Sequence, residues 1–167
     1  MNSTTLFSRE PVISLPDNNS RYEAMASMLN DTKKPNLLLV EDSEDDAFFF
    51  GRTLQKSGFD CTYEHVHNGA EAVDYLISAA RSNALPQVIF LDLKMPVLNG
   101  FDVLEWMQSQ NSLKPVRVVV LSGSDQPSDK ERATKLGAAA YFVKPLKTSD
   151  LTFLKEVCPK PSMGAPV

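Results

Sequence analysis

Four short apolar runs in the sequence are each followed at once by side chains that can bind a metal, a phosphate or a proton. Glu41 and Asp42 follow NLLLV, Asp92 follows VIFL, Ser122 follows VRVVVL, and Lys144 follows AAYFV. Carboxylates held near one another repel, so such a group needs a proton or a cation. Mg²⁺ takes oxygen ligands and keeps water and substrate oxygens in its shell. With a hydroxyl and an ammonium group nearby, this set suits phosphoryl transfer onto a carboxylate.

Taken singly, each of these residues has a simpler structural interpretation. The acidic pair is typical of a helix start, where Asp42 or Ser43 would serve as the N-cap. Asp92 would cap a turn, Ser122 would be a loop hydroxyl, and Lys144 would be a surface charge. The recurrence of such residues after four predicted strands favours a shared site over four unrelated features.

The apolar pattern predicts five strand–helix units in succession. Unbroken apolar runs suit strands covered on both faces, and apolar residues at helical spacing occupy the segments between them. The predicted strands are 36–40, 61–66, 88–92, 116–121 and 139–143, and the predicted helices are 44–57, 70–80, 101–108, 128–136 and 150–157. A closed barrel would need eight such units, so we expect an open, doubly wound, five-stranded parallel sheet of the flavodoxin-like α/β class. Ligands of such sheets bind outside the carboxyl ends of the strands.

Length and composition exclude several classes of protein. With 167 residues the chain is long enough for one domain with a sizeable core. Its net charge of −4 gives no basic face for nucleic acid. It has no apolar run of about 18 residues, so we expect no membrane span. The two cysteines lack C-x-x-C spacing and the N-terminus lacks a secretory signal, which predicts reduced thiols and a cytoplasmic protein.

The ends of the chain differ in composition from the middle. Residues 1–34 are polar and broken by proline and asparagine, which predicts a flexible N-terminal extension. Within it, a capping-box spacing and an apolar face predict a short helix over 20–30, either transient or docked. The domain itself should cover 35–157. The proline-rich tail 158–167 should be loose.

Four segments together resemble a known family. LLLVEDSEDD, FLDLKMPVLNG, VVLSG and AAYFVKP are similar to the motifs of the response-regulator receiver domain of two-component signal transduction. The resemblance covers roughly residues 35 to 157 and implies the flavodoxin-like (βα)5 receiver fold. Because only about ten residues follow the last predicted helix, we expect a stand-alone receiver of the chemotaxis-regulator-like or phytochrome-partner-like kind.

The resemblance also implies a phosphoacceptor and a metal site. Asp92 looks like the residue that receives a phosphoryl group from the phosphohistidine of a sensor histidine kinase. Asp42 looks like a direct ligand of Mg²⁺, Glu41 like one acting through water, and the backbone carbonyl of Lys94 would complete the metal site with Asp92. Family members often have aspartate at both acidic positions. Glutamate at position 41 should therefore alter the metal site without abolishing it.

Three further positions match residues that respond to phosphorylation in this family. Ser122 and Lys144 match the switch hydroxyl and the phosphate-binding lysine, and the Lys144–Pro145 bond would be cis. Tyr141 matches the aromatic residue that turns inward after phosphorylation. We therefore expect a switch that changes partner binding on the face of the fourth helix, fifth strand and fifth helix, where a second copy of the chain is one candidate partner.

Two other functions remain open at this point. The chain would serve as a phosphorelay intermediate if it passed the phosphoryl group to a histidine phosphotransfer protein. It would be a constitutive protein-binding module if the phosphorylation site were unused, although the complete set of Asp42, Asp92, Ser122 and Lys144 argues against that.

Rival motifs fail on spacing. An EF-hand loop beginning at Asp42 would need glycine and glutamate where the chain has Ala47 and Thr53. A haloacid-dehalogenase-type phosphatase would usually have a second acid where Lys94 stands, so we do not expect an enzyme. His65 and His67 share one strand face and could bind a metal, but we expect them simply to be exposed at a sheet edge.

Overall fold

The computed structural model describes residues 34–158 of the chain. The predicted helix over 20–30 lies outside the described residues, as does the predicted tail beyond residue 158. None of the helices in the described part is long and apolar enough to cross a membrane.

Five parallel strands form one sheet in the order β2-β1-β3-β4-β5. The strands are β1 (Asn36–Val40), β2 (Thr62–Val66), β3 (Val88–Leu91), β4 (Arg117–Ser122) and β5 (Ala140–Val143). This confirms the predicted doubly wound sheet. The strand order reverses between β1 and β3, so the crevice for a ligand is expected at the carboxyl ends of these two central strands.

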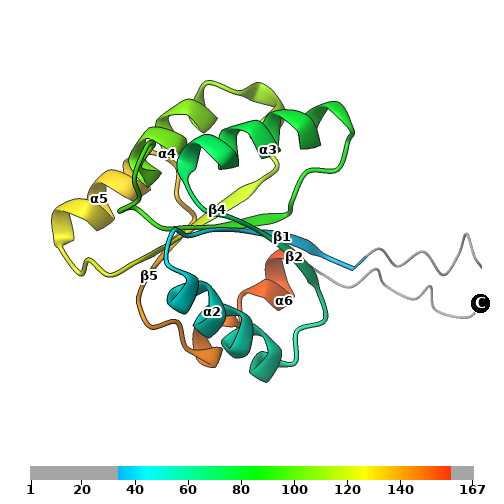
Figure 1. Ribbon diagram of the computed structural model, residues 1–167, viewed down its shortest axis with the longest axis vertical. Coiled ribbons are helices and arrows are strands. Elements are labelled where there is room, and N and C mark those ends of the chain that lie inside the picture. Colours follow the sequence, from blue (N-terminus) through cyan, green and yellow to red (C-terminus); the bar gives the residue numbers. More distant parts are fainter. Residues whose placement is uncertain (1–33, 159–167) are drawn as a thin grey trace, which may run out of the picture. The chain divides into compact units, whose positions relative to one another are not determined.

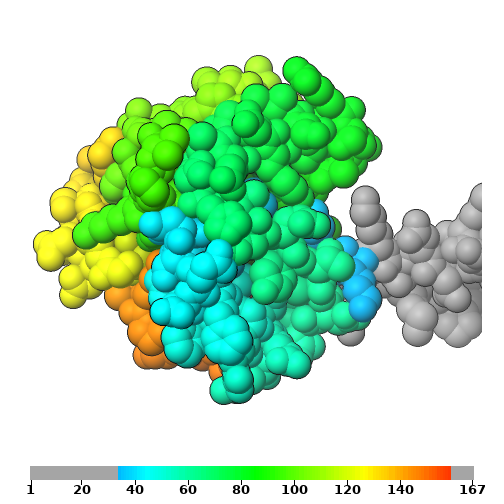
Figure 2. All heavy atoms as spheres, in the orientation of Figure 1, coloured from blue at the N-terminus to red at the C-terminus, as the bar shows by residue number. Residues whose placement is uncertain are grey.

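Within residues 34–158, five α-helices and two 3₁₀ helices lie between or after the strands. The helices are α2 (Glu44–Ser57), α3 (Gly69–Arg81), α4 (Gly100–Gln108), α5 (Pro127–Lys135) and α6 (Leu154–Val157), with η1 at Asn111–Leu113 and η2 at Thr148–Leu151. In Figure 1, α2 and α6 lie on one face of the sheet, and α3, α4 and α5 lie on the other. Figure 2 shows that side chains fill the space that the ribbons leave between α2 and α3.

The last predicted helix is wrong in form. In place of one helix over 150–157, the structure has the 3₁₀ helix η2 followed by the single turn of α6. The carboxylate of Asp150 accepts a hydrogen bond of 2.9 Å from the backbone N–H of Lys147. The helical segment therefore begins at Thr148, two residues earlier than the sequence pattern predicts.

The core has two halves, one on each face of the sheet. The side chains of β3 alternate between them: Ile89 and Leu91 pack toward α3 and α4, whereas Val88 and Phe90 pack toward α2 and α6. All four residues of β3 are fully buried. A strand covered on both faces explains the unbroken apolar sequence of VIFL.

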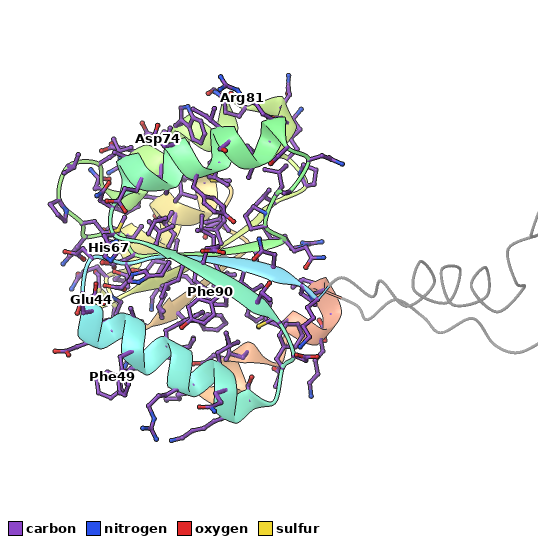
Figure 3. The ribbon with its side chains drawn as sticks, turned by 45° about the vertical axis from the view of Figure 1, so that its right-hand side comes forward. Glu44, Phe49, His67, Asp74, Arg81 and Phe90 are labelled. Carbon is purple, nitrogen blue, oxygen red and sulfur yellow. The ribbon has the colours of Figure 1, made fainter. Side chains whose placement is uncertain are left out.

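The phenylalanine run of α2 is split between core and surface. Phe50 is 2% exposed and stacks edge-to-face on Phe90, with 4.9 Å between ring centroids. Phe48 and Phe49 are 60% and 59% exposed. Figure 3 shows Phe90 between the sheet and α2, while Phe49 points away from the sheet. The 3.6-residue period of the helix accounts for this division.

Candidate functional site

The predicted acidic residues meet at the carboxyl edge of β1 and β3. Val40 pairs with Leu91 in the sheet, so the residues that follow them emerge side by side. The backbone N–H of Asp92 donates to the carbonyl of Val40 at 3.0 Å, and that of Glu41 donates to the carbonyl of Val66 at 3.0 Å. These bonds continue the sheet ladders by one residue, so the backbone that carries both acids is held by the sheet.

The three carboxylates lie within coordinating reach of one another. One oxygen each from Glu41, Asp42 and Asp92 lies within 4.8 Å of the other two. Glu41 is 2% and Asp92 is 5% exposed, whereas Asp42 is exposed. The edge therefore combines two buried acids with one that solvent reaches.

Ser43 caps the helix that follows the acidic pair. Its hydroxyl accepts a hydrogen bond of 3.3 Å from the N–H of Asp46, and its own N–H donates to Glu41 Oε1 at 3.2 Å. The cap is thus Ser43 and not Asp42, which decides between the two alternatives that the sequence left open. The carboxylate of Asp42 is not needed to cap α2.

Burial dominates the protonation of the two inner acids. Desolvation raises the pKa of Asp92, against the opposing effects of the Lys144 charge and the backbone N–H groups of Lys94 and Leu93. The Leu93 N–H donates to Asp92 Oδ1 at 2.8 Å. Desolvation likewise raises the pKa of Glu41, against a hydrogen bond from Lys144. A bound cation would stabilise the ionised form of both acids, because it would compensate for the hydration that they lose on burial.

Lys144 reaches this edge from the end of β5. Its Nζ lies 2.6 Å from Glu41 Oε2, 2.8 Å from Asp46 Oδ2 and 3.7 Å from Asp92 Oδ2. Burial lowers the pKa of the Lys144 ammonium, but hydrogen bonds to Asp46 and Glu41 outweigh burial and raise it. The lysine is therefore charged at neutral pH. As the resemblance implies, the Lys144–Pro145 bond is cis.

Asp46 is a member of this cluster that the sequence analysis did not identify. It stands in the first turn of α2, three residues after the N-cap Ser43, and meets a lysine 98 positions later in the chain. The spacing S-x-x-D was a usable signal, because a capping-box position turns its carboxylate toward the helix start. Helix periodicity alone could not pair it with Lys144.

Ser122 and Tyr141 are joined through one loop. Ser122 is fully buried at the end of β4, and its hydroxyl accepts a hydrogen bond of 3.2 Å from the N–H of Ser124. The hydroxyl of Tyr141 donates to the carbonyl of Ser124 at 2.8 Å. Burial raises the pKa of Tyr141, against a hydrogen bond with Ser122. Ser122 and Tyr141 are therefore linked by hydrogen bonds to the backbone of the same residue, Ser124.

The loop after Asp92 lies close over the site. Lys94 is exposed, and Gly100, where α4 begins, packs against the backbone of Asp92 and Leu93. A Cβ atom at Gly100 would collide with the carbonyl oxygen of Asp92, so only glycine fits here. The N–H of Gly100 donates to the carbonyl of Leu93 at 3.1 Å. This contact fixes the loop that carries the Lys94 carbonyl.

A hard divalent cation fits the donor set. Glu41, Asp42, Asp46 and Asp92 oppose a single ammonium group, that of Lys144, which leaves an excess of three negative charges if all are ionised. All the side-chain donors at the edge are carboxylate oxygens, the ligands that Mg²⁺ prefers. The exposed carboxylate of Asp42 leaves a side through which water and a phosphate can approach.

Comparison with known proteins decides the family. Residues 37–154 match the family model described as "Response regulator receiver domain". The chain belongs to the receiver-domain family of two-component response regulators. Among curated relatives, this receiver is similar to the probable methanogenesis regulatory protein FilR2 of Methanothrix harundinacea, with 34% identity over 116 residues. The alignment covers 69% of this chain and 75% of that protein.

Solved structures of response regulators share the receiver's fold. The phosphorylated cyanobacterial phytochrome response regulator RcpA aligns with a TM-score of 0.65 and 28% identity, covering 79% of this chain and 99% of that one. The Mn²⁺-bound form of response regulator Rcp1 aligns with a TM-score of 0.63 and 25% identity, covering 80% and 99%. This receiver therefore shares its architecture with regulators whose names refer to phosphorylation, phytochromes and a divalent metal.

Proposed function

We propose that this receiver is a phosphorylation-controlled switch that accepts a phosphoryl group on Asp92 from a sensor histidine kinase. The observation that carries the proposal is the buried carboxylate of Asp92, which has two further acids within 4.8 Å and the Lys144 ammonium at 3.7 Å. A buried carboxylate, further carboxylate oxygens and a cation thus lie at one edge of the sheet, and this set supports phosphoryl transfer onto Asp92.

In the proposed transfer, a carboxylate oxygen of Asp92 forms a bond to phosphorus as the phosphorus–nitrogen bond of the kinase phosphohistidine breaks. The electron pair of that bond returns to the imidazole nitrogen. Asp92 is 5% exposed, so the donor must approach through the side of the edge where Asp42 is exposed. A histidine side chain presented by another protein has the reach to do so.

The acidic residues would hold Mg²⁺ as the resemblance implies. Asp42 and Asp92 would bind it directly, Glu41 through water and Lys94 through its backbone carbonyl. When bound, Mg²⁺ neutralises phosphoryl oxygens and aligns them for transfer. Glu41 already accepts a hydrogen bond from Lys144 at 2.6 Å, which supports its assignment to the outer shell.

Lys144 would exchange partners when Asp92 is phosphorylated. Its Nζ is bound to Glu41 and Asp46, and lies 3.7 Å from Asp92 Oδ2. A phosphoryl group on Asp92 extends toward Lys144 and offers oxygens that make stronger, charge-assisted hydrogen bonds. Ser122 would donate its hydroxyl to another phosphoryl oxygen. In doing so it would release Ser124 N–H and alter the loop that Tyr141 contacts.

The output would be a change in protein binding on the face of α5, β5 and α6. Tyr141 lies on β5, and its ring has the Lys130 ammonium of α5 at 5.8 Å from its centroid. A repositioned Tyr141 would change this face for a partner protein or a second copy of the chain. The likeness to regulators of phytochromes supports a phytochrome-type kinase as the donor. The two free cysteines, Cys61 and Cys158, support a cytoplasmic setting.

Phosphorylation by acetyl phosphate tests the proposal. With Mg²⁺ the full chain should gain the mass of one phosphoryl group, stable in acid and labile in base, and chelator should prevent the gain. Asp92→Asn should gain none, while Asp74→Asn, a change at an exposed acid of α3, serves as the matched control. Asp42→Ala should weaken Mg²⁺ binding because it removes a direct ligand. Equal labelling of Asp92→Asn and the wild type would refute the assignment of the acceptor.

A further inference from the structure

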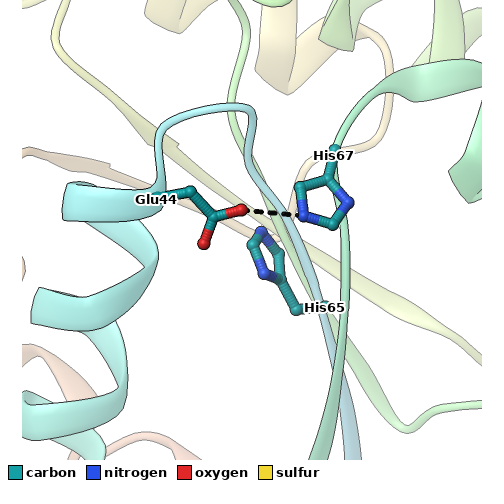
Figure 4. Close-up of side chains that lie close together, drawn as sticks. All are labelled: Glu44, His65 and His67. Carbon is teal, nitrogen blue, oxygen red and sulfur yellow. Dashed lines mark hydrogen bonds and ion pairs between the residues drawn. The ribbon is translucent and has the colours of Figure 1, made fainter.

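The only two histidines of the chain stand together on the edge strand of the sheet. His65 and His67 are two positions apart on β2, so their side chains leave the same face of the strand. Their ring centroids are 4.5 Å apart. Both were expected only to be exposed at an edge; His67 is exposed, but His65 is half-buried. Figure 4 shows that the two rings and the carboxylate of Glu44 converge on one place.

Glu44 supplies a third donor from a different element. It is the first residue of α2, and its Oε1 lies 2.9 Å from His67 Nε2. One ring nitrogen from each histidine and one oxygen of Glu44 lie within 4.8 Å of one another. Ligand atoms around a tetrahedral Zn²⁺ are roughly 3.3 Å apart, because each lies at about 2.0 Å from the ion. Only small side-chain rotations would bring the three donors to that spacing.

The outer hydrogen bonds already orient both rings. Glu71 Oε2 accepts from the backbone N–H of His67 at 2.9 Å and lies 3.4 Å from His67 Nδ1. A proton on Nδ1 directed at Glu71 leaves the Nε2 lone pair facing Glu44 and the shared space. The side-chain amide of Asn68 donates a hydrogen bond of 2.9 Å to the other oxygen of Glu71, Oε1. A carboxylate behind a histidine is the usual support of a metal-binding imidazole.

His65 connects this cluster to the acidic edge. Its Nε2 lies 2.8 Å from the backbone carbonyl oxygen of Glu41, which can only accept a hydrogen bond. His65 therefore contacts the end of the strand that carries the carboxylates. The metal-ligand atoms of the histidine cluster, however, include imidazole nitrogens, whereas those of the acidic edge are all oxygens. Imidazole nitrogens suit zinc and related transition metals, whereas Mg²⁺ prefers oxygen.

We propose that His65, His67 and Glu44 form a second metal site, which takes a divalent transition-metal ion of the zinc class. Two nitrogens and one carboxylate oxygen leave a fourth position for water, as in open zinc sites. The side chains of His67 and Glu44 are 52% and 76% exposed, so an ion reaches them from solvent. The competing explanation is a surface ion pair of His67 with Glu44, which would need no metal and contribute little stability.

Calorimetric titration of Zn²⁺ into the full, untagged chain tests the proposal, with Mg²⁺ kept saturating so that the acidic edge is not the site measured. We expect one Zn²⁺ per chain. His65→Gln and His67→Gln should each weaken binding by about tenfold or more, because even loss of an outer-shell partner has effects of that size. Asp74→Asn and Cys61→Ser should bind as the wild type does. Circular dichroism of each variant in chelator verifies its folding.

Imidazole proton signals give an independent measurement. The chain has two histidines, so one equivalent of Zn²⁺ should shift both sets of ring signals together, and Mg²⁺ alone should not. Unchanged Zn²⁺ affinity in both histidine variants would overturn the proposal. So would loss of binding in Asp42→Asn or Cys61→Ser, because the ion would then be on the acidic edge or on a thiol. Ring signals that do not respond to Zn²⁺ would also exclude the two histidines as ligands.

Discussion

Replacing Asp92 with asparagine should stabilise the folded protein when no divalent cation is bound. Asparagine has nearly the same shape and keeps an oxygen to accept the 2.8 Å hydrogen bond from Leu93 N–H. What disappears is one buried negative charge beside two like-charged neighbours, the buried Glu41 and the exposed Asp42. The expectation is unusual for a buried residue, since most substitutions in a core destabilise.

The magnitude follows from the distances at the carboxyl edge. Oxygens of Glu41 and Asp42 lie within 4.8 Å of Asp92, and each such repulsion is about 3.5 kcal/mol at an effective dielectric constant of about 20. The attraction between Asp92 and Lys144 at 3.7 Å offsets about 4.5 kcal/mol of the two repulsions taken together. Solvent around the exposed Asp42 reduces the remainder. We therefore expect Asp92→Asn to gain about 1–3 kcal/mol in its free energy of unfolding at pH 7.

The gain should depend on pH in a defined direction. Because burial raises the pKa of Asp92, the folded protein binds this proton more tightly than the unfolded chain does. Wild-type stability therefore falls as pH rises from the unfolded pKa, about 3.9, through the folded pKa. Asparagine does not titrate. The advantage of the variant should be greatest above the folded pKa of Asp92 and shrink as the pH falls toward about 4.

Thermal and urea unfolding followed by circular dichroism, in chelator and in Mg²⁺, measures this difference. In chelator the melting temperature of Asp92→Asn should rise by about 4 °C for each kcal/mol gained. Saturating Mg²⁺ should stabilise the wild type more than the variant and reduce or reverse the difference. Asp74→Asn controls for the loss of an exposed acid, since Asp74 lies on the outer side of α3 (Figure 3). An Asp92→Asn protein at least about 1 kcal/mol less stable than wild type in chelator would refute the reasoning, because it would mean that the lysine pair outweighs the repulsion.

Three further changes have definite expected outcomes. Lys94→Asn should shorten the lifetime of the phosphorylated state by up to about fivefold, because the exposed cation obstructs the in-line water; a lifetime unchanged or longer after rapid removal of the donor would contradict this. Burial raises the pKa of the Cys61 thiol to about 11. Its alkylation at pH 8 should therefore be about 100-fold slower than that of an unperturbed thiol, and the rate should rise about tenfold per pH unit. Rapid labelling at pH 8 would exclude the raised pKa. Gly100→Ala should lower the free energy of unfolding by about 1–3 kcal/mol in urea melts, whereas Gly123→Ala, with open space around its Cβ, should change it little; equal effects would mean that the Asp92 backbone yields easily.

Much of the architecture could be predicted from local patterns. The strands β1 and β3 and the helix α2 have the predicted extents, apart from the last residue of β3, because a buried strand and an amphipathic helix each impose a period that the sequence must show. The convergence of Glu41, Asp42, Asp92 and Lys144 was predictable for a related reason. All parallel strands end at one edge, so the residues after them must meet there.

Other features depend on which elements become neighbours, and no local period contains that information. Asp46 meets Lys144 only because α2 begins beside the end of β5, across 98 positions of sequence. Glu44 meets His67 across 23 positions of sequence only because α2 starts beside the edge strand β2.

The chain's own periodicity thus determined the strands, the helices and the edge where the acids gather. The tertiary structure decided which charge each acid or histidine contacts, and which side chains lose their water. Those contacts depend on strand order and on the crossover of each helix, and burial then shifts the pKa values of Asp92 and Glu41. The ion pairs of these acids and histidines are a property of the packed molecule. The free energies of desolvation and of charge–charge interaction depend on distances that only folding sets.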